Sequence, residues 1–376
     1  MNILINLSNN LGGGGLQVAL SFLEECKKIE GHVYHIFLGK NAQMQVDKNF
    51  FPADFVFYDI PKLKFWQYQI ILGPLEKQIK PDCVFTVFGP SYWKPNAPHL
   101  IGFAIGHYIY DEYAFFNRIS CWQRMKIKLR KWVHLLFFVK QASHFVVETE
   151  DARKRLRKQL NVDTIDVVSN TCGSQYFCHS DFANKMPEKK RGEIRLITLT
   201  RYYSHKNIES IPNVLEELKL RNIDNVNFVL TLGEEDYKNI IPMEWRHKVY
   251  NVGSVPIVEC PSLYQECDFL FLPTLLEVFS ASYPEAMAMR KPILTSDLSF
   301  AHSICGDAAL YFEPFSPSDI VDKIEILINN KEAQVKLIEE GKKRLSAFGS
   351  AKDRAEKYLQ ICENLAFGVK YDIVHQ

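Results

Sequence analysis

The segment DFLFLP (268–273), followed three residues later by EVFSASYPEAMAM (277–289), has the pattern of a strand, a loop and a helix. The first part is a short apolar run that ends in Pro, and Pro284 begins a run of good helix formers. Such a unit gathers unpaired backbone N–H groups at the helix start, where an anion can bind. Glu277 then lies in the loop and Glu285 a turn or more inside the helix. Phosphate and hydroxyl groups could both be held there, although two Glu residues eight apart also occur by chance on helix surfaces.

Short apolar runs alternate with longer amphipathic runs along the whole chain. This alternation predicts parallel sheets with helices on both faces. In the first half we expect strands at 3–7, 33–38, 56–58, 84–87, 100–104, 144–147 and 165–168, with helices at 16–29, 66–79 and 151–160. In the second half we expect strands at 195–199, 226–232, 249–252, 268–272, 293–296 and 309–312, with closing helices at 318–329, 331–348 and 352–367.

The chain turns polar and loses its periodicity between Ser180 and Gly192, which indicates a linker. Its 376 residues suit two domains of roughly 150 to 200 residues each. We therefore expect an N-terminal domain at 1–178, a linker at 179–193 and a C-terminal domain at 194–349.

Four further motifs accompany the two Glu residues. Gly12 to Gly15 form a glycine-rich turn between the first strand and the first helix, and glycines permit close approach of backbone to a ligand. Arg201 and Lys206 come just past an apolar strand, five residues apart. The other two motifs come later in the chain and are NVGSVP (251–256) and AHSICGDAALYFEP (301–314).

These five segments, in this order, resemble the family 4 retaining glycosyltransferases, whose acidic signature is Glu, seven residues, Glu, closing with Glu-Ala-Met-Ala. The resemblance covers most of the chain. It implies an α/β GT-B fold, with two doubly wound Rossmann-like domains that face each other across a cleft. The N-terminal domain would be on the acceptor side and the C-terminal domain would bind the nucleotide sugar. The last helix, at about 350–376, would pack back on the N-terminal domain.

The resemblance also implies roles for individual residues. Arg201 and Lys206 would grip the diphosphate of the donor, Glu277 would approach the sugar hydroxyls, and Glu285 would accept hydrogen bonds from the ribose. His107, in GFAIGHYIYDEY, resembles the family's active-site His near the donor sugar, although a lone His after a strand is often structural. Further substrate contacts would come from Gly13, Gly14, Gly15, Gly253, Val255, Val278, Phe279, Ser280 and Ala281.

Two residues depart from the family pattern, because Val278 and Ser280 stand where many members have Gly. A β-branched Val does not take a positive φ cheaply, so the backbone contacts of this loop with the donor sugar should differ. Asp111 and Glu112, near His107, could orient an acceptor, but an exposed loop is the simpler interpretation.

The residue types at the predicted site suit sugar transfer. The reaction develops negative charge on the leaving phosphate, which Arg201 could bind through a bidentate fork and Lys206 as a mobile point charge. The sequence has no Asp-x-Asp triplet, so the protein cations would take the place of magnesium. We therefore expect no cofactor and no metal, a UDP-, GDP- or ADP-sugar as donor, and a glycan or lipid-linked acceptor.

Composition restricts the class and compartment. The formal net charge of +1 predicts no nucleic-acid partner. Nine Cys residues without a Cys-x-x-Cys pair suit a reducing cytosol, and the N-terminus lacks the features of an export signal. The most apolar run, Trp132 to Val139, is under half the length that crosses a bilayer. We expect a cytoplasmic protein.

Residues 118–158 are rich in Lys and Arg, with aromatic residues interleaved. This segment predicts a basic amphipathic helix that could lie on the inner face of the cell membrane as a peripheral contact. A core-packing helix with a solvated basic face explains the composition equally well.

Three other functions remain to be weighed. An NAD-dependent oxidoreductase is disfavoured because Gln17 stands where the third Gly of its fingerprint belongs and the second strand does not end in an acidic residue. A nucleotide-sugar epimerase or hydrolase would share the fold and the donor site. A non-catalytic sugar-binding protein is the alternative from another class.

Overall fold

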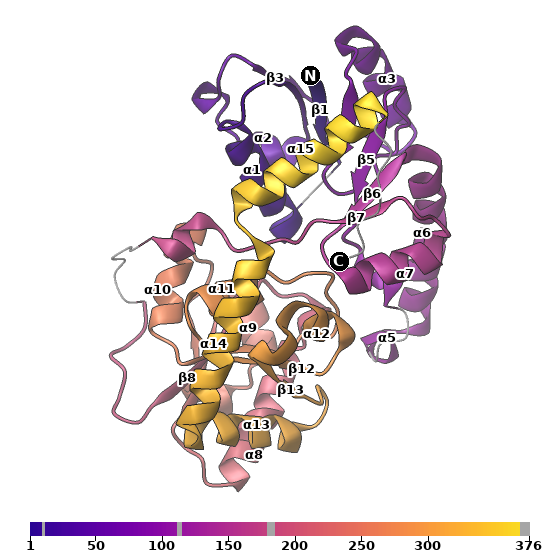
Figure 1. Ribbon diagram of the computed structural model, residues 1–376. Coiled ribbons are helices and arrows are strands. Elements are labelled where there is room, and N and C mark those ends of the chain that lie inside the picture. Colours follow the sequence, from indigo (N-terminus) through magenta and orange to yellow (C-terminus); the bar gives the residue numbers. More distant parts are fainter. Residues whose placement is uncertain (10–11, 111–114, 179–184, 369–376) are drawn as a thin grey trace. The chain divides into compact units, whose positions relative to one another are not determined.

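The computed structural model describes residues 1–9, 12–110, 115–178 and 185–368, which form two compact α/β units (Figure 1). The first unit comprises the described residues of Met1–Asp111, Ile119–Asn170 and Gly349–Gln376. The second comprises those of Glu112–Arg118 and Thr171–Phe348. The predicted fold class, with two parallel Rossmann-like sheets, is confirmed.

The first unit is built on a sheet of seven parallel strands. Its order reverses after β1, because β2 and β3 extend the sheet on one side and β4 to β7 on the other. The register aligns Ile5 with Ile36 on one side and with Phe85 on the other. In spatial order the strands are β3 (Phe55–Asp59), β2 (Val33–Leu38), β1 (Asn2–Leu7), β4 (Cys83–Thr86), β5 (His99–Gly102), β6 (His144–Val147) and β7 (Ile165–Val167).

Both faces of this sheet are covered by helices. Successive strand residues point to opposite faces, so Ile3 and Ile5 belong to one apolar cluster and Leu4 to another. The first cluster includes residues of α1 (Gly13–Cys26) and α15 (Ala351–Phe367), which pack against each other and are seen side by side in Figure 1. The second includes residues of α3 (Gln67–Ile79). The last helix of the chain is thus part of the core of the first unit.

Three rings illustrate how α15 is held. Phe22 of α1 packs edge-on against Phe85 of β4 at 5.4 Å and against Tyr358 of α15 at 5.5 Å between ring centroids. All three side chains are buried. A Ser350 and Asp353 capping box begins α15. Aromatic packing and capping together fix this helix on the sheet.

The remaining helices of the first unit are short, apart from two. α6 has 21 residues and begins at a capping box between Ser120 and Gln123. α7 begins at Thr149, whose side chain accepts a hydrogen bond from the Ala152 amide. The bounds are α2 (Lys40–Gln43), η1 (Lys48–Phe50), α4 (Gly106–Ile109), α6 (Cys121–Gln141) and α7 (Glu150–Leu160).

The basic segment 118–158 is not one helix. α6 and α7 are separated by strand β6, which is completely buried between β5 and β7. The break follows from the sequence HFVV, because the three apolar positions after His144 pack in a parallel sheet that is buried on both faces. In the part of the chain that the structure describes, we find no helix of the length and apolarity that a membrane span requires.

The second unit contains six parallel strands, and its order reverses between β8 and β11. Leu196, Phe228 and Phe271 lie in one apolar cluster with residues of α8 and α13. The opposite face carries Ile197, Val229 and Leu270, which are fully buried. In spatial order the strands are β10 (Val249–Asn251), β9 (Val226–Leu230), β8 (Ile194–Thr198), β11 (Phe269–Leu272), β12 (Ile293–Ser296) and β13 (Ala309–Phe312).

The helices of the second unit alternate with its strands, as the sequence pattern predicts. α14 packs against α11, where Gly341 comes close to Met287. The bounds are α5 (Phe115–Arg118), η2 (Ser174–Phe177), η3 (Ser204–Lys206), η4 (Ile208–Ser210), α8 (Ile211–Leu220), α9 (Glu234–Ile240), η5 (Met243–Lys248), η6 (Ile257–Glu259), α10 (Cys260–Gln265), α11 (Ser282–Ala288), α12 (Ser299–Cys305), η7 (Gly306–Ala308), α13 (Pro317–Asn329) and α14 (Lys331–Phe348).

Candidate functional site

The predicted donor residues of the second unit lie at the edge of its sheet where the strand order reverses. β8 and β11 are neighbours and parallel, so the loops that follow them leave at the same edge. In open α/β sheets this point is where ligands bind. The loop after β8 carries Arg201 and Lys206, and the loop after β11 carries Glu277.

Lys206 and Glu277 form an ion pair between these two loops. The Lys206 ammonium donates to Glu277 Oε1, and the two side chains are 14% and 13% exposed. Since they come from positions 71 residues apart in sequence, only the folding of both strands brings them together. The structure therefore joins two of the predicted site residues directly.

The ion pair is supported by the backbone beneath it. Thr274 Oγ1 is 3.1 Å from Glu277 Oε1 and 3.2 Å from the carbonyl oxygen of His205. The amide of Leu275 donates to the same carbonyl at 2.7 Å. Burial lowers the pKa of His205, against a smaller opposing effect of Glu277. His205 is thus held mainly neutral beside the pair at pH 7, and the loop is tied to the end of β11.

Arg201 lies at the same loop but is exposed. Its side chain makes no hydrogen bond or ion pair with any residue that the structure describes. The backbone before it is fixed, because the Thr200 amide donates to Thr231 Oγ1 at 3.0 Å and Thr231 Oγ1 donates back to the Thr200 carbonyl at 3.0 Å. Arg201 therefore presents a free guanidinium from an anchored loop.

The turn after Lys206 depends on Asn207. This residue is buried and has a φ of 54°, in the left-handed region that Asn tolerates better than most residues. Its amide nitrogen donates to the Pro314 carbonyl at 3.2 Å, and its amide oxygen accepts from Arg118. The Arg118 guanidinium also lies over the ring of Phe315 at 5.4 Å. Asn207 thereby ends η3 and orients Lys206.

Glu285 lies in the first turn of α11, among hydroxyl and thiol groups. Tyr264 donates to Glu285 Oε2 at 3.2 Å, and the rings of Tyr264 and Tyr176 meet edge-on at 5.9 Å. Burial raises the pKa of Glu285 to about 7, against the lowering effects of both tyrosine hydroxyls and of Lys206. Its negative charge in turn contributes, after burial, to raising the pKa of Cys172 to about 12. Glu285 is therefore poised between its acid and carboxylate forms near neutral pH.

The loop between Glu277 and α11 is mostly buried. Val278 and Ser280 are each 5% exposed, and the Phe279 ring packs edge-on against Phe348 at 5.8 Å. Neither Val278 nor Ser280 has a positive φ, so the loop has a backbone that these residues adopt without strain. Ala281 precedes α11 with helical dihedrals and forms no side-chain cap. Val278 and Ser280 thus fit this loop without backbone strain.

Gly253 and Val255 follow β10 rather than β8 or β11. Gly253 has a φ of 71° and no neighbour that would meet an added Cβ, while Val255 is partly buried. The turn is fixed through Asn251, whose side chain exchanges hydrogen bonds with the backbone of Leu232 at 3.0 and 3.1 Å. Among the described residues, no hydrogen bond or ion pair joins this turn to the Lys206–Glu277 pair.

The predicted site residues of the first unit are Gly13, Gly14, Gly15 and His107. The three glycines are the first residues of α1, and Gly13 has a φ of 55°. At Gly15 an added Cβ would lie 3.4 Å from Phe88, whereas Gly14 has open space. His107 is partly buried in α4, just after β5. Asp111 and Glu112 lie outside the described residues.

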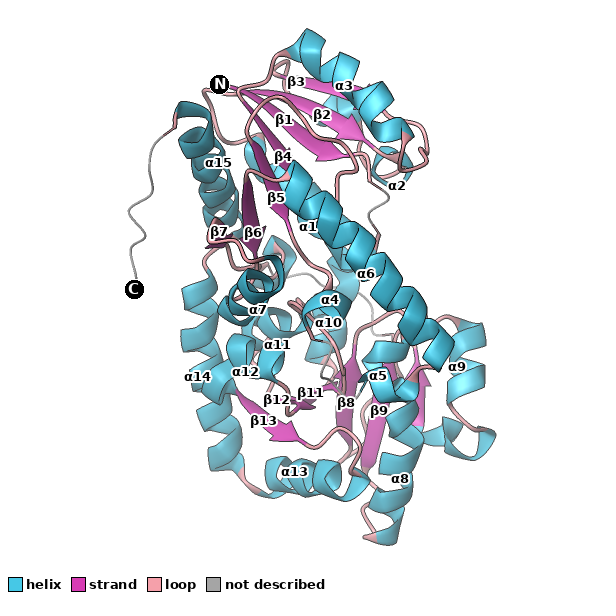
Figure 2. Ribbon diagram, turned by 90° about the vertical axis from the view of Figure 1, so that its right-hand side faces the viewer, coloured by secondary structure: helices cyan, strands magenta, loops and turns pink. Residues whose placement is uncertain are grey.

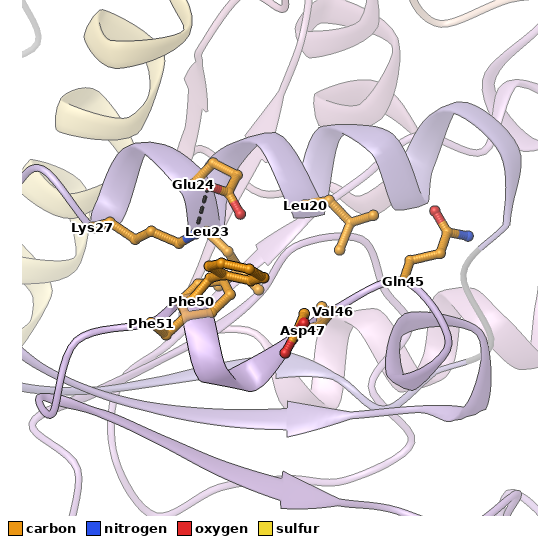
Figure 3. Close-up of a pocket in the computed structure, with 9 residues that line it drawn as sticks. All are labelled: Leu20, Leu23, Glu24, Lys27, Gln45, Val46, Asp47, Phe50 and Phe51. Atoms are coloured by element: carbon orange, nitrogen blue, oxygen red, sulfur yellow. Dashed lines mark ion pairs between the residues drawn. The ribbon is translucent and has the colours of Figure 1, made fainter. Parts of the chain in front are cut away.

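A cavity of about 480 Å³ opens elsewhere in the first unit (Figure 3). It lies between α1 and the segment 45–51, with the rings of Phe50 and Phe51 facing the side chains of α1. Lys27 pairs with Glu24 at 2.7 Å and lies 3.9 Å from the centroid of the Phe51 ring. None of the predicted site residues lines this cavity.

In the stretch 301–314, the side-chain contacts serve to hold α12 in place. The ring of His302 stacks on Tyr311 at 3.7 Å between centroids and its Nε2 lies 2.6 Å from Asp297 Oδ1. Arg344 of α14 donates to the Ile304 carbonyl at 2.7 Å, at the end of α12. These contacts secure α12 between β12 and α14.

Sequence reasoning missed the groups that surround the Glu residues. Thr274, His205 and Asn207 support the ion pair, and Tyr176 and Tyr264 flank Glu285. Thr274 could have been suspected, since it lies three residues before Glu277 in a loop. Tyr176 and Tyr264 precede Glu285 by 109 and 21 positions, and no local pattern announces that they meet it.

Parts of the chain are similar in sequence to known glycosyltransferases. The model of the family described as "Glycosyl transferases group 1" matches residues 180–344. The O-antigen chain mannosyltransferase RfbU of Salmonella typhimurium is 27% identical over 183 residues, 47% of this chain and 48% of that protein. The N,N'-diacetylbacillosaminyl-diphospho-undecaprenol alpha-1,3-N-acetylgalactosaminyltransferase of Campylobacter jejuni is 27% identical over 175 residues, 45% of this chain and 41% of that protein. The chain thus spans about half the length, or less, of these relatives.

Solved structures share the whole fold. A glycosyltransferase from Rickettsia africae ESF-5 has a TM-score of 0.73 at 17% identity, covering 97% of this chain and 98% of that one. Anabaena HepE in complex with UDP-glucose has a TM-score of 0.70 at 12% identity, covering 97% of this chain and 100% of that one. The fold is therefore of the GT-B type, and the matches together support a glycosyltransferase family.

Proposed function

We propose that this protein is a retaining glycosyltransferase of family 4 that transfers a sugar from a nucleotide-diphosphate sugar to a glycan or lipid-linked acceptor. We place it in the cytoplasm, in the biosynthesis of a surface polysaccharide or another glycoconjugate. The observation that carries the proposal is the ion pair between Lys206 and Glu277 at the reversal of strand order, beside the free guanidinium of Arg201.

Charge complementarity supports a diphosphate donor. A pyrophosphate that approaches this edge meets Arg201 and Lys206, whose cations suit bidentate and point-charge contacts. The carboxylates of Glu277 and Glu285 cannot bind phosphate and are suited to accept hydrogen bonds from hydroxyl groups. A nucleotide sugar carries both kinds of group, so it matches the site better than a simple phosphate or a neutral sugar.

The same residues favour the transition state. As the bond between the anomeric carbon and the phosphate oxygen breaks, its electron pair passes to the phosphate, and negative charge there grows. In a front-face transfer the acceptor oxygen bonds to the anomeric carbon from the leaving-group side, and the acceptor proton passes to the leaving phosphate. The anomeric configuration is retained without an enzyme nucleophile. Arg201 and Lys206 would stabilise the leaving diphosphate, and the resemblance to family 4 enzymes assigns His107 a part in the transfer.

Names of the relatives inform the choice of acceptor. RfbU is described as an O-antigen chain mannosyltransferase, and the Campylobacter jejuni relative is named for a diphospho-undecaprenol acceptor. The first name points to a polysaccharide chain, and the second to a lipid-linked acceptor. We extend this class of acceptor to the present chain. A lipid-linked acceptor would be met at the inner face of the cell membrane.

The donor can be identified by its effect on stability. A ligand at 100 times its Kd raises the free energy of unfolding by about 2.7 kcal/mol, which is readily seen as a rise in Tm. UDP-, GDP- and ADP-sugars would be screened in this way with the wild-type protein and with Lys206→Ala. A nucleotide sugar that stabilises the wild type and not the variant supports the proposal. If none of them stabilises the wild type, the proposed donor class is wrong.

Turnover distinguishes the remaining alternatives. A transferase releases the nucleotide only when an acceptor is added, whereas an epimerase isomerises and a hydrolase cleaves the donor alone. A sugar-binding protein releases no nucleotide under any of these conditions. Lys238→Ala is a matched control for Lys206→Ala, because Lys238 lies in the same unit on exposed helix α9 and, among the described residues, forms an ion pair only with its helix neighbour Glu234.

A further inference from the structure

Helix α6 has two apolar faces, of which only one is used within its unit. On the inner face Phe138 packs against Phe103 at 5.2 Å between ring centroids. His134, also on this face, lies 2.9 Å from the Tyr92 hydroxyl and 3.0 Å from the Tyr108 hydroxyl. These contacts tie the helix to the sheet and to α4, so the outer face is held in place by the fold.

The outer face of α6 is a row of large apolar side chains open to solvent. Its members are 43% to 64% exposed and are Trp122, Met125, Leu129, Trp132, Leu136 and Val139. They recur at spacings of three and four residues, which places them on one side of a helix with 3.6 residues per turn. In Figure 2, α6 runs along the outside of its unit. This row is called the outer stripe below.

The charge on α6 is of one sign. None of its 21 residues is Asp or Glu, whereas six are Lys or Arg. On a helical wheel, Lys126 and Lys140 lie at one border of the outer stripe and Lys128 lies at the other. All three are exposed, and no ion pair of the described residues includes them.

The spacing of the outer stripe would also suit a coiled coil with a second copy, but the flanking residues oppose it. In such a seam Lys126, Lys128 and Lys140 occupy the positions next to the apolar row, where opposite charges normally pair across the interface. Two copies would bring these lysines together with no carboxylate on either helix. Like charges so placed are destabilising, which leaves an anionic partner as the better match.

A loop beside α6 extends the apolar surface. Phe65 and Trp66 are both more than half exposed, and the Phe65 ring packs against Phe137 of α6 at 6.2 Å. Lys64 lies over the Trp66 ring at 5.1 Å. Trp residues flanked by Lys are typical of the boundary between lipid headgroups and acyl chains, because the ring is apolar with a polar N–H.

We propose that the outer stripe of α6, with Phe65 and Trp66, is a membrane-docking surface for anionic lipid bilayers. The apolar side chains would enter the boundary of the acyl chains while Lys126, Lys128 and Lys140 bind lipid phosphates. Half of the basic residues of α6 thus acquire a defined role. The surface is independent of the donor site, so its test requires neither nucleotide sugar nor acceptor.

Vesicle flotation tests this proposal with the full chain. Wild-type protein should float with vesicles of phosphatidylcholine and phosphatidylglycerol and much less with phosphatidylcholine alone. The variant Lys126→Gln/Lys128→Gln/Lys140→Gln should bind anionic vesicles about a hundredfold more weakly, given a roughly fivefold effect per lysine. The variant Leu129→Gln/Trp132→Gln should lose binding while it keeps the basic residues.

The control has the same change of charge at three exposed lysines elsewhere in the unit, Lys40→Gln/Lys77→Gln/Lys158→Gln. It should bind like the wild type. The proposal is overturned if the wild type does not float with anionic vesicles, or if the control and the α6 lysine variant bind equally. It is also overturned if light scattering shows a dimer that Leu129→Gln/Trp132→Gln converts to a monomer, since a second copy would then cover the stripe.

Discussion

Lys206 and Glu277 lie in the loops that follow two neighbouring parallel strands and neutralise each other at the surface of the second unit. Each is about one-seventh exposed, so the pair is shielded from water and from salt better than most surface ion pairs. Among the residues that the structure describes, Lys206 and Thr274 both donate to Oε1 of Glu277, so its second carboxylate oxygen is available to other partners. The arrangement can therefore hold Lys206 ready while leaving an acceptor for a hydroxyl group.

The stability costs of removing the two partners should not add. Lys206→Ala leaves a mostly buried carboxylate without its cation and should lower the free energy of unfolding by about 1–3 kcal/mol. Glu277→Gln should cost a similar amount, whereas the double variant should cost less than the sum. A double-mutant cycle measured by urea unfolding gives the coupling energy directly.

The matching control cycle uses Glu234 and Lys238, an exposed pair one turn apart on α9. Its coupling should be only about 0.3–0.5 kcal/mol. Equal coupling energies in the two cycles would mean that Lys206 and Glu277 interact no more strongly than an ordinary surface pair. In that case the site is not held together by the ion pair in solution.

Arg201 should contribute to donor binding and not to the stability of the fold. Its side chain is exposed and has no described partner, so Arg201→Ala should change the free energy of unfolding by less than about 0.5 kcal/mol. Loss of charge-assisted hydrogen bonds to a diphosphate should weaken donor binding by about 10- to 100-fold. Arg201→Lys should restore only part of it, because Lys lacks the bidentate fork.

Calorimetric titration with the donor found by stability screening would measure this effect. Arg191→Ala is the control, since Arg191 is an exposed arginine of the same unit before β8. If Arg201→Ala and Arg191→Ala bind the donor alike, the diphosphate contacts other residues.

Glu285 should make stability depend on pH. Its folded-state pKa is raised to about 7, above the ordinary value of 4.5, so the folded state binds its proton more tightly than the unfolded chain. Between pH 4.5 and 7 the folded state holds more protons, and the free energy of unfolding therefore falls as pH rises. Burial of the Glu285 carboxylate lowers the free energy of unfolding by an amount of the order of 2–3 kcal/mol. This loss of stability is fully present above pH 7 and absent below pH 4.5.

Glu285→Gln keeps the shape of the side chain and removes this titration. Relative to the wild type it should be more stable at pH 8 and nearly unchanged at pH 4.5, as measured by urea unfolding at both pH values. A constant difference between the two proteins across this range would show that Glu285 does not titrate there. Tyr264→Phe in the same assay should enhance the pH dependence, because the hydroxyl bond that favours the carboxylate is lost.

Much of the fold follows from local sequence patterns. Residues 33–38, 144–147, 293–296 and 309–312 are strands as predicted, and 331–348 is a helix as predicted. These segments are strongly periodic or uniformly apolar, so the local pattern agrees with the packing. Ends shift elsewhere by up to three residues, as at α1, which begins at Gly13 and not at residue 16. A glycine run gives no periodic signal, and the start of that helix depends on the turn.

The site was predictable only in part. Lys206, Glu277 and Glu285 come together in the fold because the loops that carry Lys206 and Glu277 follow strands that become neighbours, which the alternation of strands and helices already suggests. The environment of Glu285 was not predictable, since Tyr176 comes from a distant part of the chain and changes the character of the carboxyl group only after folding. The outer stripe of α6 likewise needed the structure, because a sequence does not tell which of two apolar faces is buried.

Adjacent glycines at the start of α1 should respond in opposite ways to the same substitution. Gly13 has a φ of 55°, where an L side chain costs about 1–2 kcal/mol, so Gly13→Ala should lower the Tm. At Gly14 the backbone is helical and an added Cβ meets no neighbour. Gly14→Ala should therefore raise the free energy of unfolding by about 0.5–1 kcal/mol.

A larger side chain at Gly14 tests whether the glycine turn binds substrate or only directs the path of the chain. Since the position is open, Gly14→Leu should fold as well as Gly14→Ala, which can be checked by comparing their Tm values. If a substrate lies against this turn, the leucine side chain would occupy its place, and transfer should fall at least tenfold while the stability is kept. Full activity of Gly14→Leu would show that only Gly13 needs to be glycine and that the turn serves the chain path alone. Gly14 is therefore the position at which a ligand-binding turn and a purely structural turn give different measurements.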